Sequence, residues 1–81
     1  MLMGMIRIRP AASDEHARDR FEELREARGE DYASLSRMIG RPAGYLRRYA
    51  REGLPKRLRD AERRDLAGYF GVHECELGVT P

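Results

Sequence analysis

One stretch, residues 31 to 51, constrains the fold more than any other part of the chain. Four of its residues recur at the i, i+3, i+4 and i+7 spacing of a buried helical face: Tyr32, Leu35, Ser36 and Ile39. Asp31 is expected to cap this helix. Gly40 is expected to end it, because glycine adopts a left-handed terminal conformation at little cost. The first half of the stretch therefore predicts a short helix with one buried face.

A second helix is predicted directly after this glycine, from Pro42 to about Ala50, because a proline at the first helical position loses no hydrogen bond. Leu46 and Tyr49 are three residues apart and are expected to point back toward the first helix. The residues that remain on the outer face are Gly44, Arg47, Arg48 and Arg51. Two helices joined by a short turn that contains glycine, the second helix being basic on its outside, match the helix-turn-helix pattern.

This stretch resembles the Cro/lambda-repressor-like (XRE-type) helix-turn-helix family. The residues that carry the resemblance, in the family's order and spacing, are Leu35, Ser36, Ile39, Gly40, Leu46 and Tyr49. Residues 51 to 77 are similar to the family's later helices, so the resemblance covers roughly residues 14 to 78. Ser36 is a departure, since the family usually has alanine there. The resemblance is nearest to the DNA-binding part of phage-type and LexA-like repressors, and it implies DNA binding, mostly as a homodimer on two-fold operators.

Length and composition limit the remaining possibilities. A chain of 81 residues supports one domain with a single modest core. The single cysteine, Cys75, permits no disulfide framework, and zinc-ligand spacing is absent, so a reducing, cytoplasmic setting is expected. The sequence contains no run of about 18 apolar residues, so no membrane span is predicted.

Positive charge is concentrated around the predicted second helix. Residues 37–59 contain eight basic residues and one acid, Glu52, giving a net charge of +7, whereas the segments before and after this block carry −2 and −3. A phosphate-binding face requires such an asymmetry rather than a high total charge. Arginine content alone has another explanation, a GC-rich genome in which arginine replaces lysine. Residues 18–28 carry four arginines with no expected DNA role.

The rest of the chain predicts an arm, three more helices and a tail. Residues 1–12 form the arm, which is expected to be a flexible leader, a strand that pairs with a second copy, or a basic arm along DNA. A helix over residues 14–28 is expected to be capped by Ser13 and ended by Gly29.

A fourth helix is expected to begin with Asp60 as its cap and to end at Gly71. It should turn three residues inward: Leu66, Tyr69 and Phe70. A short last helix around residues 74–77 completes the core, and residues 79–81 form the tail. The predicted fold is therefore an all-α, compact bundle of about five helices over residues 13–78, with a lambda-repressor-like helix-turn-helix.

The expected function is sequence-specific binding of double-stranded DNA by a transcriptional regulator, a repressor by the resemblance, with helix 42–50 in the major groove. Arg47 and Arg48 are the expected base readers, because arginine pairs bidentately with guanine. Phosphate contacts are expected from Arg41 and Arg57, which flank the helix. Tyr45 is open to three interpretations: core, phosphate contact or base contact. The full set of expected DNA-binding residues is Arg41, Pro42, Ala43, Gly44, Tyr45, Arg47, Arg48, Arg51, Lys56 and Arg57.

The chain is expected to be either an excised DNA-binding domain or a small stand-alone regulator. Two other classes of function also fit parts of the sequence. A helix-turn-helix fold also serves as a protein-interaction module, such as an antitoxin or adaptor. RNA binding ranks lower, because no aromatic-studded sheet is predicted. Catalysis is not expected, because Cys75 and His73 are two residues apart and would not face each other on a helix. No cofactor or metal is expected either, since His16 has no partner ligand at a suitable spacing.

Overall fold

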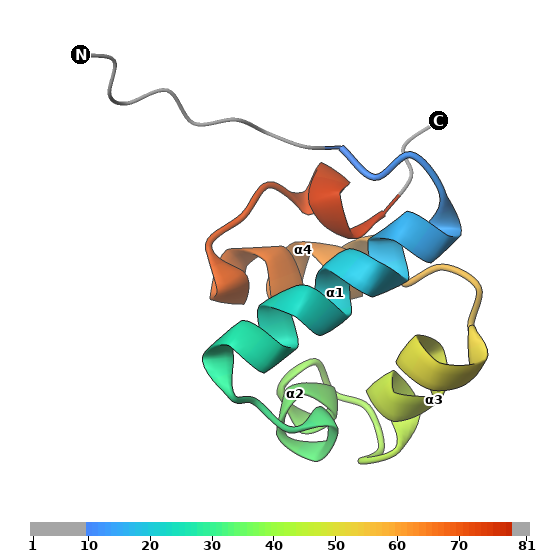
Figure 1. Ribbon diagram of the computed structural model, residues 1–81. Helices are drawn as coiled ribbons and strands as arrows, with labels where there is room; N and C mark the ends of the chain where they lie inside the picture. Colours follow the sequence, from blue (N-terminus) through green and yellow to red (C-terminus); the bar gives the residue numbers. More distant parts are fainter. Residues whose placement is uncertain (1–9, 79–81) are drawn as a thin grey trace.

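The computed structural model describes residues 10–78, in which the chain folds into four α-helices and one short 3-10 helix, without strands (Figure 1). Most of the predicted arm and all of the predicted tail, residues 1–9 and 79–81, lie outside the described residues. The elements are α1 (Asp14–Arg28), α2 (Tyr32–Met38), α3 (Tyr45–Glu52), α4 (Asp60–Phe70) and η1 (Glu74–Leu77). The prediction of an all-α bundle is confirmed at this level.

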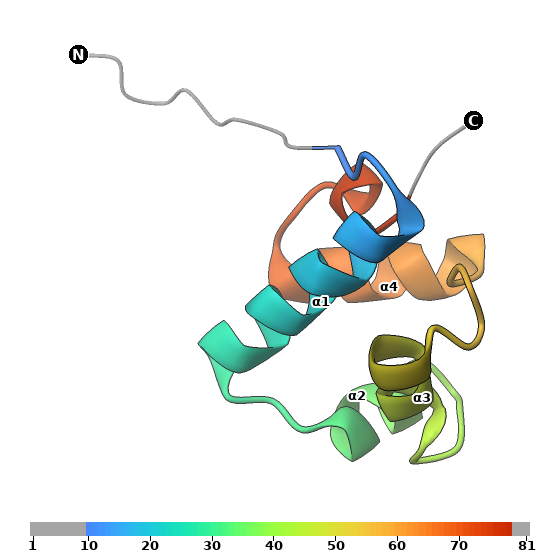
Figure 2. The ribbon, with the colours of Figure 1, turned by 45° about the vertical axis from the view of Figure 1, so that its right-hand side comes forward.

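The first helix has the predicted bounds because its two ends are determined locally. The Ser13 hydroxyl oxygen accepts a hydrogen bond from the His16 N–H at 3.1 Å, and Gly29 ends the helix with a φ of 66°. Both views show α1 crossing α4, with α2 and α3 side by side below them (Figures 1 and 2). The described end of the arm is tied to the same body, since the Ala11 N–H donates to the Cys75 carbonyl at 2.8 Å.

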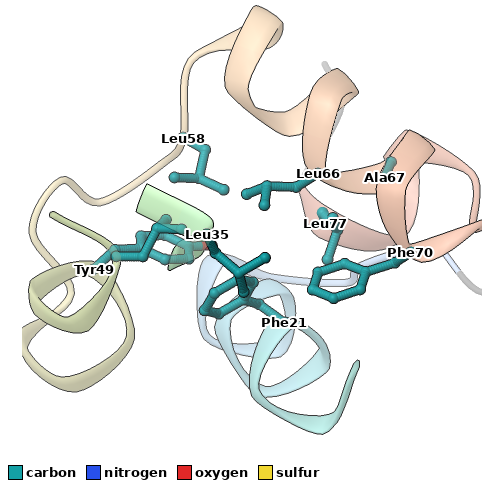
Figure 3. Close-up of a cluster of buried hydrophobic side chains, with 9 residues drawn as sticks. Phe21, Leu35, Tyr49, Leu58, Leu66, Ala67, Phe70 and Leu77 are labelled. Atoms are coloured by element: carbon teal, nitrogen blue, oxygen red, sulfur yellow. The ribbon is translucent and has the colours of Figure 1, made fainter. Parts of the chain in front are cut away.

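Every element, together with the loop before α4, contributes to one hydrophobic core (Figure 3). Phe21 of α1 is fully buried at its centre, with ring centroids of Tyr49 and Phe70 at 5.8 and 6.2 Å. The nine buried core residues are Phe21, Leu35, Leu46, Tyr49, Leu58, Leu66, Ala67, Phe70 and Leu77. The predicted buried faces of α2 and α3 are thus confirmed, and α3 is held to α1 through an aromatic contact.

The inward placement predicted for Tyr69 is wrong. Its side chain is 40% exposed, whereas Phe70 enters the core. The Tyr69 hydroxyl donates a hydrogen bond to the Glu30 carboxylate, and the Arg28 guanidinium lies over its ring at 5.4 Å. Tyr69 therefore joins the ends of α1 and α4 at the surface, where its polar hydroxyl has a partner.

The turn between α2 and α3 is longer than predicted. Helix α2 ends at Met38 rather than at Gly40, although Gly40 does take the predicted left-handed conformation, with a φ of 77°. Helix α3 begins at Tyr45, not at Pro42. The Tyr45 N–H donates a hydrogen bond to the Pro42 carbonyl at 3.0 Å. Residues 42–44 therefore belong to the turn, and α3 extends to Glu52 instead of ending at Ala50.

Candidate nucleic-acid interface

The start of α3 is capped from the opposite helix. Gly44, its N-cap residue, has no side chain to offer, and the Leu46 N–H instead donates to the hydroxyl of Ser36 on α2 at 3.0 Å. Ser36 is fully buried, so this bond forms out of contact with water. The Ser36 hydroxyl therefore ties the first turn of α3 to α2.

Substituting Ser36 with alanine should lower the free energy of unfolding by about 1–3 kcal/mol, because it leaves the buried Leu46 N–H without a partner. Urea denaturation followed by circular dichroism measures this loss. Ser34→Ala is the matched control, since Ser34 is exposed on the same helix and, among the described residues, its hydroxyl bonds only to Asp31. Equal stability of the Ser36 and Ser34 variants would contradict the capping role.

The outer face of α3 carries the two predicted base readers in exposed positions. Arg47 and Arg48 both point away from the core that Leu46 and Tyr49 enter. The Arg48 guanidinium is 3.9 Å from the Glu52 carboxylate, with both side chains more than half exposed. Such a pair contributes little to stability, so it leaves Arg48 available to a stronger anionic partner.

A shallow hollow of about 290 Å³ lies at the beginning of α3. Its lining is formed by two residues of the turn and two of the helix: Pro42, Gly44, Tyr45 and Arg48. The small predicted site residues, Ala43 and Gly44, are exposed beside it. The lining of the hollow is therefore mostly uncharged, with one cationic side chain, that of Arg48.

A buried carboxylate joins the turn to α4. Glu62, in the first turn of α4, is 5% exposed, and its Oε1 accepts a hydrogen bond from the Tyr45 hydroxyl at 2.7 Å. Its Oε2 accepts from Arg41 Nε, and the Arg41 guanidinium lies 4.7 Å from the centre of the Tyr45 ring. Tyr45, for which three interpretations were open, thus packs partly against the core while its hydroxyl is bonded internally.

Glu62 was missed in the set of predicted site residues. It also caps α4, since its Oε1 accepts from the Arg59 N–H at 3.2 Å, so Arg59 rather than Asp60 is the N-cap. The available signal was the spacing: a glutamate three residues after a helix cap reaches back to the N–H of that cap. The ion pair with Arg41 had no such signal, because it spans 21 residues.

The bonds of this cluster favour the charged form of the carboxylate. Burial alone would raise the pKa of Glu62, but hydrogen bonds from Tyr45 and Arg41 outweigh it and hold the pKa below its usual value. Burial, followed by the bond to Glu62, raises the pKa of Tyr45 to about 12. The phenol is therefore a hydrogen-bond donor and the carboxylate an acceptor at neutral pH.

The remaining predicted residues separate into exposed and paired positions. Lys56 and Arg51 are exposed. Burial raises the pKa of Glu22, but hydrogen bonds from Arg25 and Tyr32, with the nearby charges of Arg25 and Arg51, outweigh burial and hold this pKa below its usual value. Arg57 donates through Nε to the Asp14 carboxylate at 2.8 Å. The structure thus brings Pro42, Gly44, Tyr45 and Arg48 together around one hollow, whereas Arg51 and Arg57 are not part of its lining.

We also searched residues 10–78 for a metal site, a histidine–cysteine pair and a membrane-spanning helix. No group of three or more histidine, cysteine, aspartate or glutamate side chains there could hold a metal ion. The Nδ1 atom of His73 accepts a hydrogen bond from the backbone N–H of Cys75 at 3.2 Å. Over the same residues, every helix is too short or too polar to span a bilayer.

Comparisons with protein-family models, curated proteins and solved structures found no match to this chain. The functional argument therefore depends on the residues and their arrangement.

Proposed function

We propose that this chain is a sequence-specific double-stranded DNA-binding domain of a transcriptional regulator. In this proposal α2, the turn and α3 form a helix-turn-helix of the lambda-repressor-like type, and α3 lies in the major groove. The observation that carries it is the two-sided character of α3. Leu46 and Tyr49 anchor one side in the core, while the exposed Arg47 and Arg48 extend from the other side, next to the exposed turn residues.

The charge distribution supports contact with a polyanion. The segment from residue 37 to 59 has a net charge of +7. Its exposed basic residues are Arg37, Arg47, Arg48, Arg51, Lys56, Arg57 and Arg59. Contacts from Arg51 and Arg57 to phosphates would fix the position of the domain on the DNA backbone, while Arg47 and Arg48 read base edges.

The hollow at the start of α3 supports close approach to the bases. Exposed Ala43 and Gly44 add almost no bulk beyond the backbone, so the edge of a base pair can come near the turn. In this arrangement the DNA site contains guanines in each half. The domain acts as a repressor in the cytoplasm, at the nucleoid, as a homodimer with half-sites about one helical turn apart.

Selection of bound duplexes from a random pool tests this function. The expected result is a two-fold motif with guanines in each half. Affinity for it should fall steeply between 50 and 200 mM salt, by about 10³-fold for a domain that contacts roughly six phosphates. Fluorescence anisotropy at a series of salt concentrations measures the slope. No enriched motif together with a flat salt response would contradict DNA binding and favour a protein-interaction module.

A further inference from the structure

The strongest candidate for an additional functional group is the cluster of Glu62, Arg41 and Tyr45. It joins the turn, the first residue of α3 and the first turn of α4 through hydrogen bonds to one carboxylate. Tyr45 belongs both to this cluster and to the lining of the hollow. The cluster therefore borders the surface that the proposed function places on DNA.

The geometry of Arg41 distinguishes this cluster from a closed internal ion pair. Only Nε of the guanidinium donates to Glu62, and within residues 10–78 no hydrogen bond uses its two terminal nitrogens. The side chain is still 31% exposed. A guanidinium offers five N–H donors in a planar fork, so a bond through Nε leaves the opposite edge able to bind an oxyanion. Stacking on the Tyr45 ring at 4.7 Å restrains the plane of that fork.

We propose that Glu62 is a positioning residue for DNA binding: it orients Arg41 so that the outer edge of the guanidinium contacts a backbone phosphate beside the groove that α3 enters. This inference rests on the proposed function. Tyr45 contributes by holding the second oxygen of the carboxylate and by supporting the guanidinium plane, and it does not itself contact phosphate.

The sign of one substitution separates this role from simple electrostatics. Glu62 carries a negative charge close to the proposed DNA surface, so removing that charge should strengthen binding if charge alone mattered. If Glu62 positions Arg41, removing it weakens binding, because glutamine turns an N–H toward Arg41 and the fork loses its fixed orientation. The two explanations predict opposite changes in affinity.

The experiment compares Glu62→Gln with Glu52→Gln on the duplex selected by the wild-type chain. Both substitutions remove one negative charge. Glu52 differs from Glu62 because it is exposed and its carboxylate is 3.9 Å from the Arg48 guanidinium, which is too far for a tight hydrogen bond. Glu62→Gln should bind about tenfold more weakly than wild type, the loss expected for one charged hydrogen bond. Glu52→Gln should bind as tightly as wild type or more tightly. Circular dichroism melts establish that each variant is folded at the temperature of the binding assay.

A double-mutant cycle supplies a readout that a purely structural role would not change. Arg41→Ala should make the slope of log affinity against log salt shallower by about 0.9, the contribution of one phosphate contact. In the Arg41→Ala background, Glu62→Gln should cause no further loss of affinity. Arg41→Lys keeps the charge but has no Nε donor to orient a fork, so it should bind almost as weakly as Arg41→Ala. It also keeps the test decisive if the Glu62 variant does not fold.

Three results would overturn the inference while leaving DNA binding intact: wild-type or tighter binding by folded Glu62→Gln, an equal loss from Glu62→Gln with or without Arg41, or full binding by Arg41→Lys. Failure of the proposed function has a different signature, since the wild-type chain itself would then show no salt-dependent binding to the selected duplex.

Discussion

Replacing Phe21 with alanine is expected to lower the free energy of unfolding by about 3–5 kcal/mol, the usual cost of removing a buried phenylalanine. The Phe21 ring is fully buried and contacts aromatic rings from α2, α3 and α4: those of Tyr32, Tyr49 and Phe70. No neighbouring element can collapse into the vacated space without losing its other contacts. The loss would remove much of the roughly 5–15 kcal/mol that stabilises a typical domain.

Urea denaturation followed by circular dichroism measures this effect. Leu54→Ala is the control, because Leu54 is 52% exposed and its truncation should change stability by no more than about 0.5 kcal/mol. A loss below about 1 kcal/mol for Phe21→Ala would show that α1 is not the element on which the other helices pack.

Features that depend on neighbouring residues could be predicted from the sequence. Ser13 and Asp31 each accept a hydrogen bond from a backbone N–H three residues later, so both caps follow from the chain itself. Gly29 and Gly71 end their helices in the left-handed conformation that glycine favours. The spacing of apolar residues likewise identified the buried faces of α2 and α3.

Features that depend on contacts between distant segments could not be predicted. Leu58, in the loop before α4, is a core residue without helical periodicity around it. Near the start of α3, the Leu46 N–H donates a hydrogen bond to the hydroxyl of Ser36, ten residues earlier in the chain and on another helix. Pro42 is a favourable first helical residue by its own conformation, but a cap supplied by another helix cannot be inferred from the neighbouring residues.

The candidate site shows the same division. Exposure of Arg47 and Arg48 followed from helical periodicity, once Leu46 and Tyr49 were assigned to the core. The internal bonds of Arg41 and Arg57 could not be inferred, because their partners Glu62 and Asp14 are 21 and 43 residues away. Charge density in the sequence gives the location of a basic face, but it does not say which cations are already paired.

Simultaneous replacement of Arg47 and Arg48 by alanine is expected to produce the largest loss of function. Each bidentate arginine–guanine contact contributes about 1–3 kcal/mol of discrimination against a wrong base. Two such contacts together contribute about 2–6 kcal/mol, so the double variant should bind the selected duplex about 30-fold to about 20,000-fold more weakly. Its fold should be unaffected, because both side chains are exposed and neither belongs to the core.

Arg64→Ala provides a matched control. Arg64 on α4 is 68% exposed and 3.4 Å from Glu74, much as Arg48 is 65% exposed and 3.9 Å from Glu52. It therefore removes a comparable charge without touching α3, and its affinity should remain within a few-fold of wild type.

Single variants distinguish base reading from charge. Affinities of Arg47→Ala and Arg48→Ala are measured on duplexes in which each guanine of the selected site is changed in turn. A base reader should lose discrimination at one position, whereas a phosphate contact should weaken binding to all sequences equally and reduce the salt slope by about 1. Arg48 lines the hollow at the start of α3, so Arg48→Ala should relax the specificity for the base pair nearest the turn. Uniform weakening by both variants would mean that α3 recognises the DNA backbone and that sequence is read elsewhere on the domain.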